Sequence, residues 1–139
     1  MENELAKIKL WSPTTIGVIA FFLGFPGGVL LAGINAHRMG DMPNKKKYIM
    51  NGGLYILAFF FFQSVFQNSG LASFVGVANI FLAYWLYHDM KDEIEENTTE
   101  KNVIELSWKK ATFIALGTLV AMTLFYIVFD VMLMFFSTQ

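Results

Sequence analysis

The sequence predicts an all-α integral membrane protein, a bundle of four transmembrane helices formed by one membrane domain over residues 1–139. Of the 139 residues, 55% are hydrophobic and 15% are charged, whereas about a quarter are charged in ordinary globular domains. The mean hydropathy is +0.50. Lys and Arg are absent between Lys9 and Arg38 and between Lys47 and Lys91. A soluble domain of this size cannot bury apolar stretches of that length, because too much of its surface must face water.

Four apolar segments approach the ~20 residues that a helix needs to cross the hydrocarbon core of a bilayer. A helix-start signal, Ser12-Pro13, precedes the first of them. The segments lie at about 14–36, 49–66, 71–87 and 111–136. Because backbone polar groups in lipid must be bonded within their own segment, we expect each segment to be a helix.

A short polar turn, Gln67-Asn68-Ser69-Gly70, separates the second and third segments. It predicts that helices two and three form an antiparallel hairpin. The second segment has a short purely apolar part after Asn51-Gly52-Gly53. The alternative is therefore that the two segments form one re-entrant hairpin, which needs protein or water around its irregular backbone.

The connection 88–110 is rich in Asp and Glu and is the one sizeable polar stretch. We expect helix three to continue into it for a few turns and to break near Asn97-Thr98-Thr99. Helix is expected to resume at Val103–Trp108. This acidic loop is the part of the chain that we expect to meet a cytoplasmic partner.

The distribution of Lys and Arg near the helix ends predicts the orientation. Both longer connections are rich in these residues, the N-terminal tail carries Lys7 and Lys9, and the C-terminal end carries none. We therefore expect both connections in the cytoplasm and both termini outside. The cluster Lys45, Lys46 and Lys47 is interpreted as a topology signal that contacts anionic lipid headgroups.

Small residues recur every four positions along the first helix. Such a stripe lets another helix backbone approach closely, and its drift around the helix suits a right-handed crossing. Two interpretations stay open: packing inside one bundle, or an interface between copies in an oligomer. The stripe consists of Ala20, Gly24, Gly28, Ala32 and Ala36.

Pro26, followed by Gly27, predicts a kink in that same helix. Proline removes the hydrogen bond to the carbonyl of Phe22 and pushes the chain off its axis. Broken helices near the midplane can form ion or substrate sites in transporters. A matching interruption in a second repeat is missing here, so a kink that serves packing is the main expectation.

Three of the polar side chains inside the apolar segments are candidates for a role within the membrane. Asn79 is expected to hydrogen-bond to a partner helix. Gln63 lies near the outer end of helix two, where it can line a vestibule or be solvated at the interface. Asp130 is expected at the outer boundary of the hydrocarbon core; a deeper setting of helix four would make it an intramembrane carboxylate.

Several functional classes find no support in the sequence. The absence of cysteine excludes disulfides and thiol catalysis, and a net charge of -1 gives no reason to expect nucleic acid as a partner. His88 and Asp92 have the spacing of a two-point metal site, but too few ligands accompany them to predict a metal. No motif of an enzyme or a cofactor site is present.

The stretch from Ser12-Pro13 through Gly24-Phe25-Pro26-Gly27-Gly28 to Asn35-Ala36-His37-Arg38-Met39-Gly40 resembles the opening of small, uncharacterised bacterial membrane proteins. In those proteins a glycine-rich first helix ends in a similar Asn…Arg-x-Gly turn. The resemblance covers about thirty residues of the printed sequence. It implies a multi-pass protein of a bacterial inner membrane and carries no activity.

Two functional hypotheses follow. The first is a non-enzymatic accessory, immunity or sensor subunit that acts through helix–helix association in the lipid bilayer, as a homo-oligomer or with a membrane-protein partner, and through its cytoplasmic acidic loop. The second is a small oligomeric ion channel or transporter built around the kinked first helix, with Asn79 and Asp130 along the path.

Overall fold

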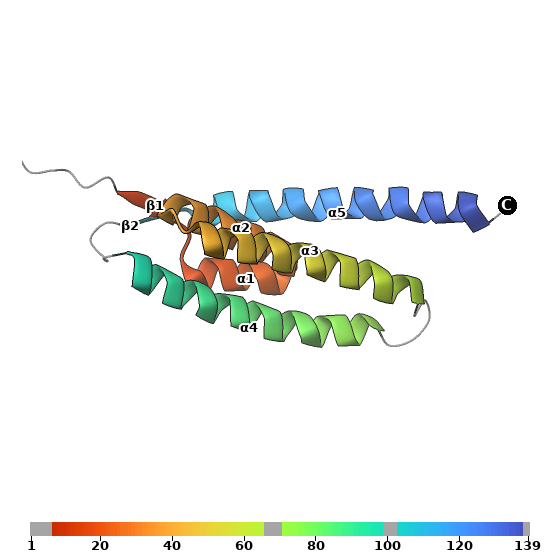
Figure 1. The fold of residues 1–139 in the computed structure, drawn as a ribbon, viewed down its shortest axis with the longest axis horizontal. Coiled ribbons are helices and arrows are strands. Elements are labelled where there is room, and N and C mark those ends of the chain that lie inside the picture. The colour runs from red at the N-terminus through yellow and green to blue at the C-terminus, as the bar shows by residue number, and fades with distance from the viewer. Residues whose placement is uncertain (1–6, 66–70, 99–102, 138–139) are drawn as a thin grey trace, which may run out of the picture.

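The computed structural model describes residues 7–65, 71–98 and 103–137, and it is an all-α fold (Figure 1). Within these residues, five helices accompany one short ladder of two parallel strands. In chain order the elements are β1 (Ile8–Leu10), α1 (Pro13–Leu23), α2 (Phe25–Met39), α3 (Met42–Val65), α4 (Leu71–Asn97), β2 (Val103–Glu105) and α5 (Trp108–Ser137).

The first apolar segment is two helices that fold back on each other, so the prediction of one kinked helix over 14–36 is wrong. The chain reverses at Gly24, whose φ of 95° is open to glycine but strained for other residues. Pro26 then lies in the first turn of α2, where its missing N–H leaves no intrahelical bond unmade. The break therefore lies at Gly24, and Pro26 helps to start a new helix instead of kinking an old one.

The α1–α2 hairpin is closed by the approach of Ala20 and Gly28. A Cβ added at Gly28 would lie 2.5 Å from the Cβ of Ala20 and 2.9 Å from Cδ2 of Leu86 on α4. Only a residue without a side chain allows α1, α2 and α4 to meet at this point. Ala32 and Ala36, farther along α2, are fully buried.

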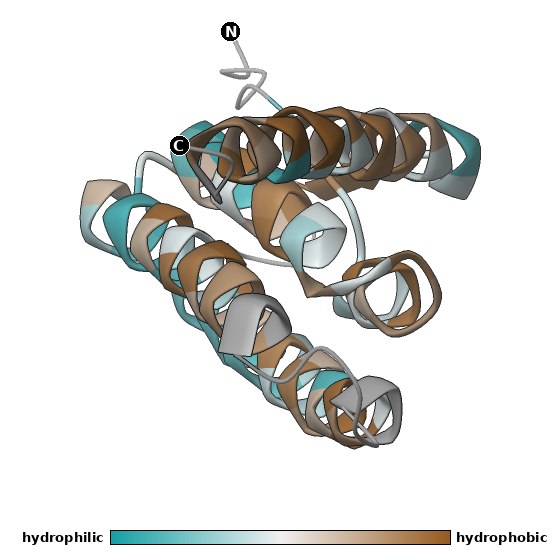
Figure 2. Cartoon of the chain, turned by 90° about the vertical axis from the view of Figure 1, so that its right-hand side faces the viewer, coloured by the Kyte–Doolittle hydropathy of each residue, from teal (hydrophilic) through white to brown (hydrophobic). Residues whose placement is uncertain are grey.

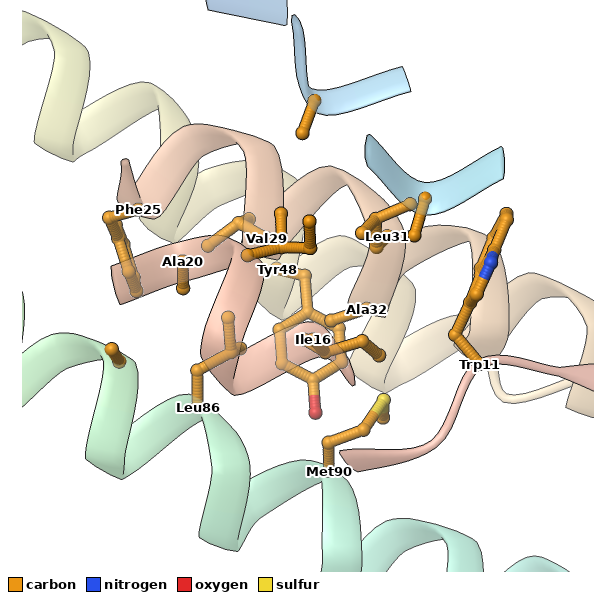
Figure 3. Packing of buried hydrophobic residues seen from close by; sticks show 14 of the residues in the cluster. Trp11, Ile16, Ala20, Phe25, Val29, Leu31, Ala32, Tyr48, Leu86 and Met90 are labelled. Carbon is orange, nitrogen blue, oxygen red and sulfur yellow. The ribbon is translucent and has the colours of Figure 1, made fainter. Parts of the chain in front are cut away.

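The hairpin forms the core on which the longer helices pack. Among the described residues, the main helix–helix contacts of α3, α4 and α5 are with α1 or α2. Figure 3 shows the buried side chains of the hairpin facing those of α3 and α4. Ile16 and Leu31 are fully buried within this cluster.

Helix α3 begins at Met42, seven residues before the predicted start at 49. The Oδ1 of Asp41 accepts a hydrogen bond from the Asn44 N–H at 3.1 Å and so satisfies one free donor of the first turn. Helix α4 extends to Asn97, in agreement with the expected break there. The expected helix at Val103–Trp108 is wrong, because this segment pairs as a strand before α5 begins.

The ladder joins the two ends of the described chain. Ile8 pairs with Val103 and Leu10 with Glu105, both in parallel register, and the Leu106 N–H donates to the Leu10 carbonyl at 2.7 Å. β1 therefore lies beside the start of α5, whereas the last turn of α5 lies at the opposite end of the molecule (Figure 1). The expectation that both termini lie on one side does not fit this arrangement, because the hairpin returns the chain to the end from which it started.

One described helix, α5, is long and apolar enough to cross a membrane, over Trp108–Phe136. None of the residues in its most apolar window is buried. Helix α1 is apolar as well but has only 11 residues. Figure 2 shows hydrophobic residues along most of the length of the helices, with hydrophilic residues gathered toward their ends.

Candidate functional site

Four polar side chains meet between the start of α3 and the end of α4. The Oη of Tyr48 lies 2.6 Å from Oδ2 of Asp89 and 2.6 Å from Oε2 of Glu93. Lys47 forms an ion pair with the same Oδ2 of Asp89 at 2.7 Å. We call Lys47, Tyr48, Asp89 and Glu93 the carboxylate cluster.

The carboxylate cluster is largely closed to solvent. Tyr48 is fully buried and Glu93 is 4% exposed. Figure 3 shows the Tyr48 ring among the core residues, with its hydroxyl directed toward α4, on which Leu86 and Met90 lie. The Oε1 of Glu93 is buried with no hydrogen-bond partner. An ionised carboxylate with an unbonded buried oxygen is costly, so this environment favours the neutral acid.

The pKa of Glu93 responds to this environment. Burial is the largest cause and raises the pKa to about 7, with the charge of Asp41 and Asp89 in the same direction, against the Tyr48 hydrogen bond and the Lys47 charge. Burial and the two carboxylates also raise the pKa of Tyr48, which stays protonated. The arrangement can therefore hold or release a proton near neutral pH.

Neighbouring side chains tie the carboxylate cluster to the ends of both helices. Asn97 Nδ2 donates to the Glu93 carbonyl at 3.0 Å and to Oδ2 of Asp41 at 3.4 Å. Oδ2 of Asp41 also accepts from Asn44 Nδ2 at 2.8 Å. These bonds link the residue before α3 to the last residue of α4.

The small residues of the stripe pack against other parts of the same chain. Ala20 and Gly28 pack on each other across the hairpin, and Gly24 forms its turn. Ala32 and Ala36 are buried on α2. An interface between copies would therefore have to use other residues.

Gly27 and Pro26 lie at the tip of the hairpin. A Cβ at Gly27 would be 3.1 Å from the Cβ of Ala115, so this glycine lets α5 approach α2. Pro26 lines an apolar pocket of about 310 Å³ that is bounded by α3 and α5, including Phe59 and Met122. The lining is mostly apolar and also includes the hydroxyl-bearing residues Thr118, Thr123 and Tyr126.

Asn79 holds the hairpin tip to α4. Its Oδ1 accepts from the Phe25 N–H at 3.2 Å, and its Nδ2 donates to the Ala20 carbonyl at 3.1 Å. The Asn79 amide thus bonds the backbone on both sides of the break between α1 and α2. Asp130 is half-buried on α5, while Asn79 hydrogen-bonds to the backbone of the hairpin. The side chain of Gln63 lies outside the described residues.

The three consecutive lysines belong to the first turns of α3, not to the preceding loop. Lys47 is engaged by Asp89 and lies 5.1 Å above the centre of the Tyr48 ring. Lys45 Nζ lies 3.4 Å from Nδ1 of His37. Lys46 is exposed and remains open to a headgroup.

Sequence reasoning missed the carboxylate cluster. Asp89 and Glu93 were counted with the acidic loop, yet both turn inward from α4. The signal was present, because Asp89 and Glu93 lie on the same helical face as the apolar pair Leu86 and Met90. The exposed acids of this segment are Asp92, Glu95 and Glu96.

His88 and Asp92, for which the sequence predicts no metal, have no third ligand grouped with them in the part of the chain that the structure describes. Among the described residues, no group of three or more His, Cys, Asp or Glu side chains is arranged to hold a metal ion. His88 instead packs edge-on against the rings of Tyr84 and Tyr87.

Comparison of the chain with protein-family models, with curated proteins and with solved structures found no match.

Proposed function

We propose that this chain is a non-enzymatic multi-pass membrane protein that acts by association with a membrane partner, either another protein or a second copy. In this proposal α3, α4 and α5 cross the bilayer, and the α1–α2 hairpin enters it from one side to about half its depth. The observation that carries the proposal is the apolar surface left exposed along the outer halves of the three long helices, beyond the hairpin tip.

The helix lengths support three crossing helices and a hairpin that enters the bilayer only part of the way. The 24, 27 and 30 residues of α3, α4 and α5 correspond to ~36, ~40 and ~45 Å at about 1.5 Å per residue, enough for a hydrocarbon core of about 30 Å. The 11 residues of α1 and 15 of α2 reach only ~16 and ~22 Å at the same rise. The pocket at the hairpin tip is lined by Tyr55 and Met122, which lie near the middle of α3 and α5.

The end of α5 carries apolar side chains on every face. From Val128 to Phe136, every residue except Asp130 is an exposed large hydrophobic. A helix that is apolar all round is suited to a protein interior or to lipid, and α5 is not buried by this chain. Lipid or a partner helix therefore accounts for its composition.

The basic residues favour one orientation. All nine described Lys and Arg lie at the end of the molecule that carries β1, since they precede α1, end α2 and α4, or begin α3 and α5. The positive-inside rule assigns this end to the cytoplasm. The N-terminus is then cytoplasmic and the C-terminus external, and Lys7 and Lys9 are no longer exceptions to the rule. The resemblance over Ser12–Gly40 supports a bacterial inner membrane.

The pattern of helix–helix contacts within the chain supports association with a membrane partner. The long helices pack chiefly on the hairpin, and beyond its tip α3 and α5 still meet where the ring of Phe60 packs against those of Phe125 and Phe129. Their outer halves nevertheless expose residues such as Phe81 and Leu133. Helix contacts in lipid depend on close packing and not on exclusion of water, which makes these exposed faces a place for a partner helix. On the cytoplasmic end, the exposed acids of α4 offer a polar contact.

The chain lacks cysteine, which permits a direct topology test. Single cysteines at the exposed positions Lys9, Lys46 and Phe136 are treated with a membrane-impermeant maleimide in right-side-out and inverted vesicles. Positions 9 and 46 are expected to react only from the cytoplasmic face, and position 136 only from the opposite face. Labelling of position 9 from outside would support four crossings instead, and release of the protein by alkaline carbonate would exclude membrane insertion.

Association is tested by photocrosslinking from the outer halves. A photoreactive amino acid at Phe81 or Leu133 is expected to give a discrete protein adduct in membranes, identified by mass spectrometry. The same photoreactive group at Glu96 tests whether a partner contacts the cytoplasmic end of α4. If the two outer positions capture only lipid, and native mass spectrometry in mild detergent gives only the monomer, the association proposal is wrong even though the topology can stand.

A further inference from the structure

We propose that the carboxylate cluster is a proton-binding site whose occupancy holds the end of α4 against the start of α3. This site does not involve a membrane partner. Its ligand is the proton, and Glu93 is the group that carries it.

The geometry requires one proton more than the hydroxyl supplies. Tyr48 Oη has a single hydrogen, yet carboxylate oxygens of Asp89 and Glu93 both lie 2.6 Å away. If both acids were ionised, one of these contacts would bring two lone pairs together at hydrogen-bond distance. One of the two carboxyls therefore donates to the Tyr48 oxygen while the hydroxyl donates to the other.

The environment assigns the extra proton to Glu93. Asp89 is paired with the ammonium of Lys47 at 2.7 Å, which compensates its negative charge. Glu93 has no ion-pair partner among the described residues, and its second oxygen is buried without a hydrogen bond. The bonded arrangement is thus Glu93 donating to Tyr48, and Tyr48 donating to Asp89.

The other charged groups around Glu93 come from few elements. On α3 and just before it these are Lys47 and Asp41, of which Asp41 disfavours the ionised form and Lys47 favours it. Helix α1 has no titratable side chain. The titratable residues of α2, His37 and Arg38, are exposed and directed to Lys45 and to the Lys9 carbonyl. The balance at Glu93 is therefore set by burial and by the acids beside it.

Release of the proton to solvent leaves Glu93 as a buried anion that faces the Tyr48 oxygen and has one unbonded oxygen. Because such an anion is costly in the interior, it moves toward water. Its route out lies at the end of α4, where the Asn97–Asp41 contact at 3.4 Å is the last link to α3. Separation of these two helix ends exposes the carboxylate cluster.

The titration is measured on the full chain in nanodiscs, with carbon-13 on the Glu side-chain carboxyls. One carboxyl resonance is expected to titrate near pH 7 and to be missing from the spectrum of Glu93→Gln. The control variant Glu96→Gln removes an exposed acid of the same helix and should leave that resonance in place. If every Glu resonance titrates at its ordinary value of about 4.3, the proposal is overturned.

The movement is measured by electron paramagnetic resonance between spin labels on cysteines at Lys46 and Glu96, both exposed. A narrow distance distribution is expected at about pH 5.5 and a longer, broader one at about pH 8.5, because ionisation of Glu93 opens the contact. In the Glu93→Gln background, the neutral amide should keep the distribution narrow at both values. An unchanged wild-type distribution, or an equal change in Glu93→Gln, would contradict the control of α4 by Glu93.

Discussion

The side chain of Asn35 pairs with both backbone polar groups of Trp11. Its Oδ1 accepts from the Trp11 N–H at 3.1 Å, and its Nδ2 donates to the Trp11 carbonyl at 2.8 Å. The Asn35 amide therefore makes the two backbone hydrogen bonds that a neighbouring strand would make, and it joins the end of β1 to α2. Arg38, one turn later, donates to the Lys9 carbonyl at 3.0 Å and lies 4.9 Å above the Trp11 ring centre.

Asn35→Ala is expected to lower the free energy of unfolding by ~2–4 kcal/mol, because it leaves a buried donor and a buried acceptor of Trp11 unbonded. His37→Ala, at an exposed position on the same helix, should change it little. Reversible denaturation in mixed micelles, followed by Trp fluorescence, measures both. Equal stability of the two variants would mean that the amide pairing carries no stability.

Gly28→Ala is expected to be destabilising by ~1–3 kcal/mol, since its Cβ would overlap Ala20 and force the hairpin apart. Gly53→Ala supplies the matched control, because nothing lies within 4 Å of its added Cβ. That control should be neutral or slightly stabilising, as alanine restricts the unfolded chain. A Gly28→Ala variant as stable as Gly53→Ala would show that α1 and α2 do not pack as described.

Asn79→Leu is expected to loosen the hairpin tip, because the Phe25 N–H loses its acceptor at the point where the helix breaks. The expected loss is ~1–3 kcal/mol for a buried group left unbonded. Limited proteolysis or hydrogen exchange across residues 20–28 measures this local loosening of the hairpin tip. Ile80→Leu, at the exposed neighbouring position, is the control; an identical exchange pattern in both would remove Asn79 from this role.

The stability of the chain is expected to depend on pH through Glu93. Its pKa is raised to about 7 in the folded state, so the folded chain retains a proton that the unfolded chain has released. The stabilisation is fully present below the unfolded value, falls as pH rises through about 7, and amounts to ~1–3 kcal/mol. Unfolding measured from acid to alkaline pH should show this decline in wild type, and Glu93→Gln should flatten it.

The helical class follows from hydropathy, but the path of the first segment does not. The apolar residues around Gly24 are continuous, and a straight helix and a hairpin place them equally well in an apolar environment. The distinguishing signal was Pro26 two residues after Gly24, which repeats the proline at the start of α1. Proline in a first turn is as typical of a helix start as proline in mid-helix is of a kink.

The sequence signals that Asp89 and Glu93 share the apolar face of α4, but it does not reveal their partner Tyr48. Tyr48 and Glu93 lie far apart in the chain, and their meeting depends on how α3 and α4 pack against the hairpin. The sequence around Glu93 is polar, and most acids in polar stretches are solvated. That polar composition therefore predicts that Glu93 is exposed. The strand Val103–Glu105 was missed similarly, since a three-residue strand has a reason to form only when β1 lies beside it.

The parallel ladder has a consequence for biosynthesis. A ribosome makes β1 first and β2 only after α4, so β1 lacks its strand partner through most of translation. The pairing closes a long loop, and contacts between residues far apart in the sequence are slow to form. Asn35, which is made within the same hairpin unit, can satisfy the Trp11 backbone before β2 exists and still does so in the complete fold. A chain that stalls before Val103 would therefore carry the α1–α2 hairpin with β1 still lacking its strand partner.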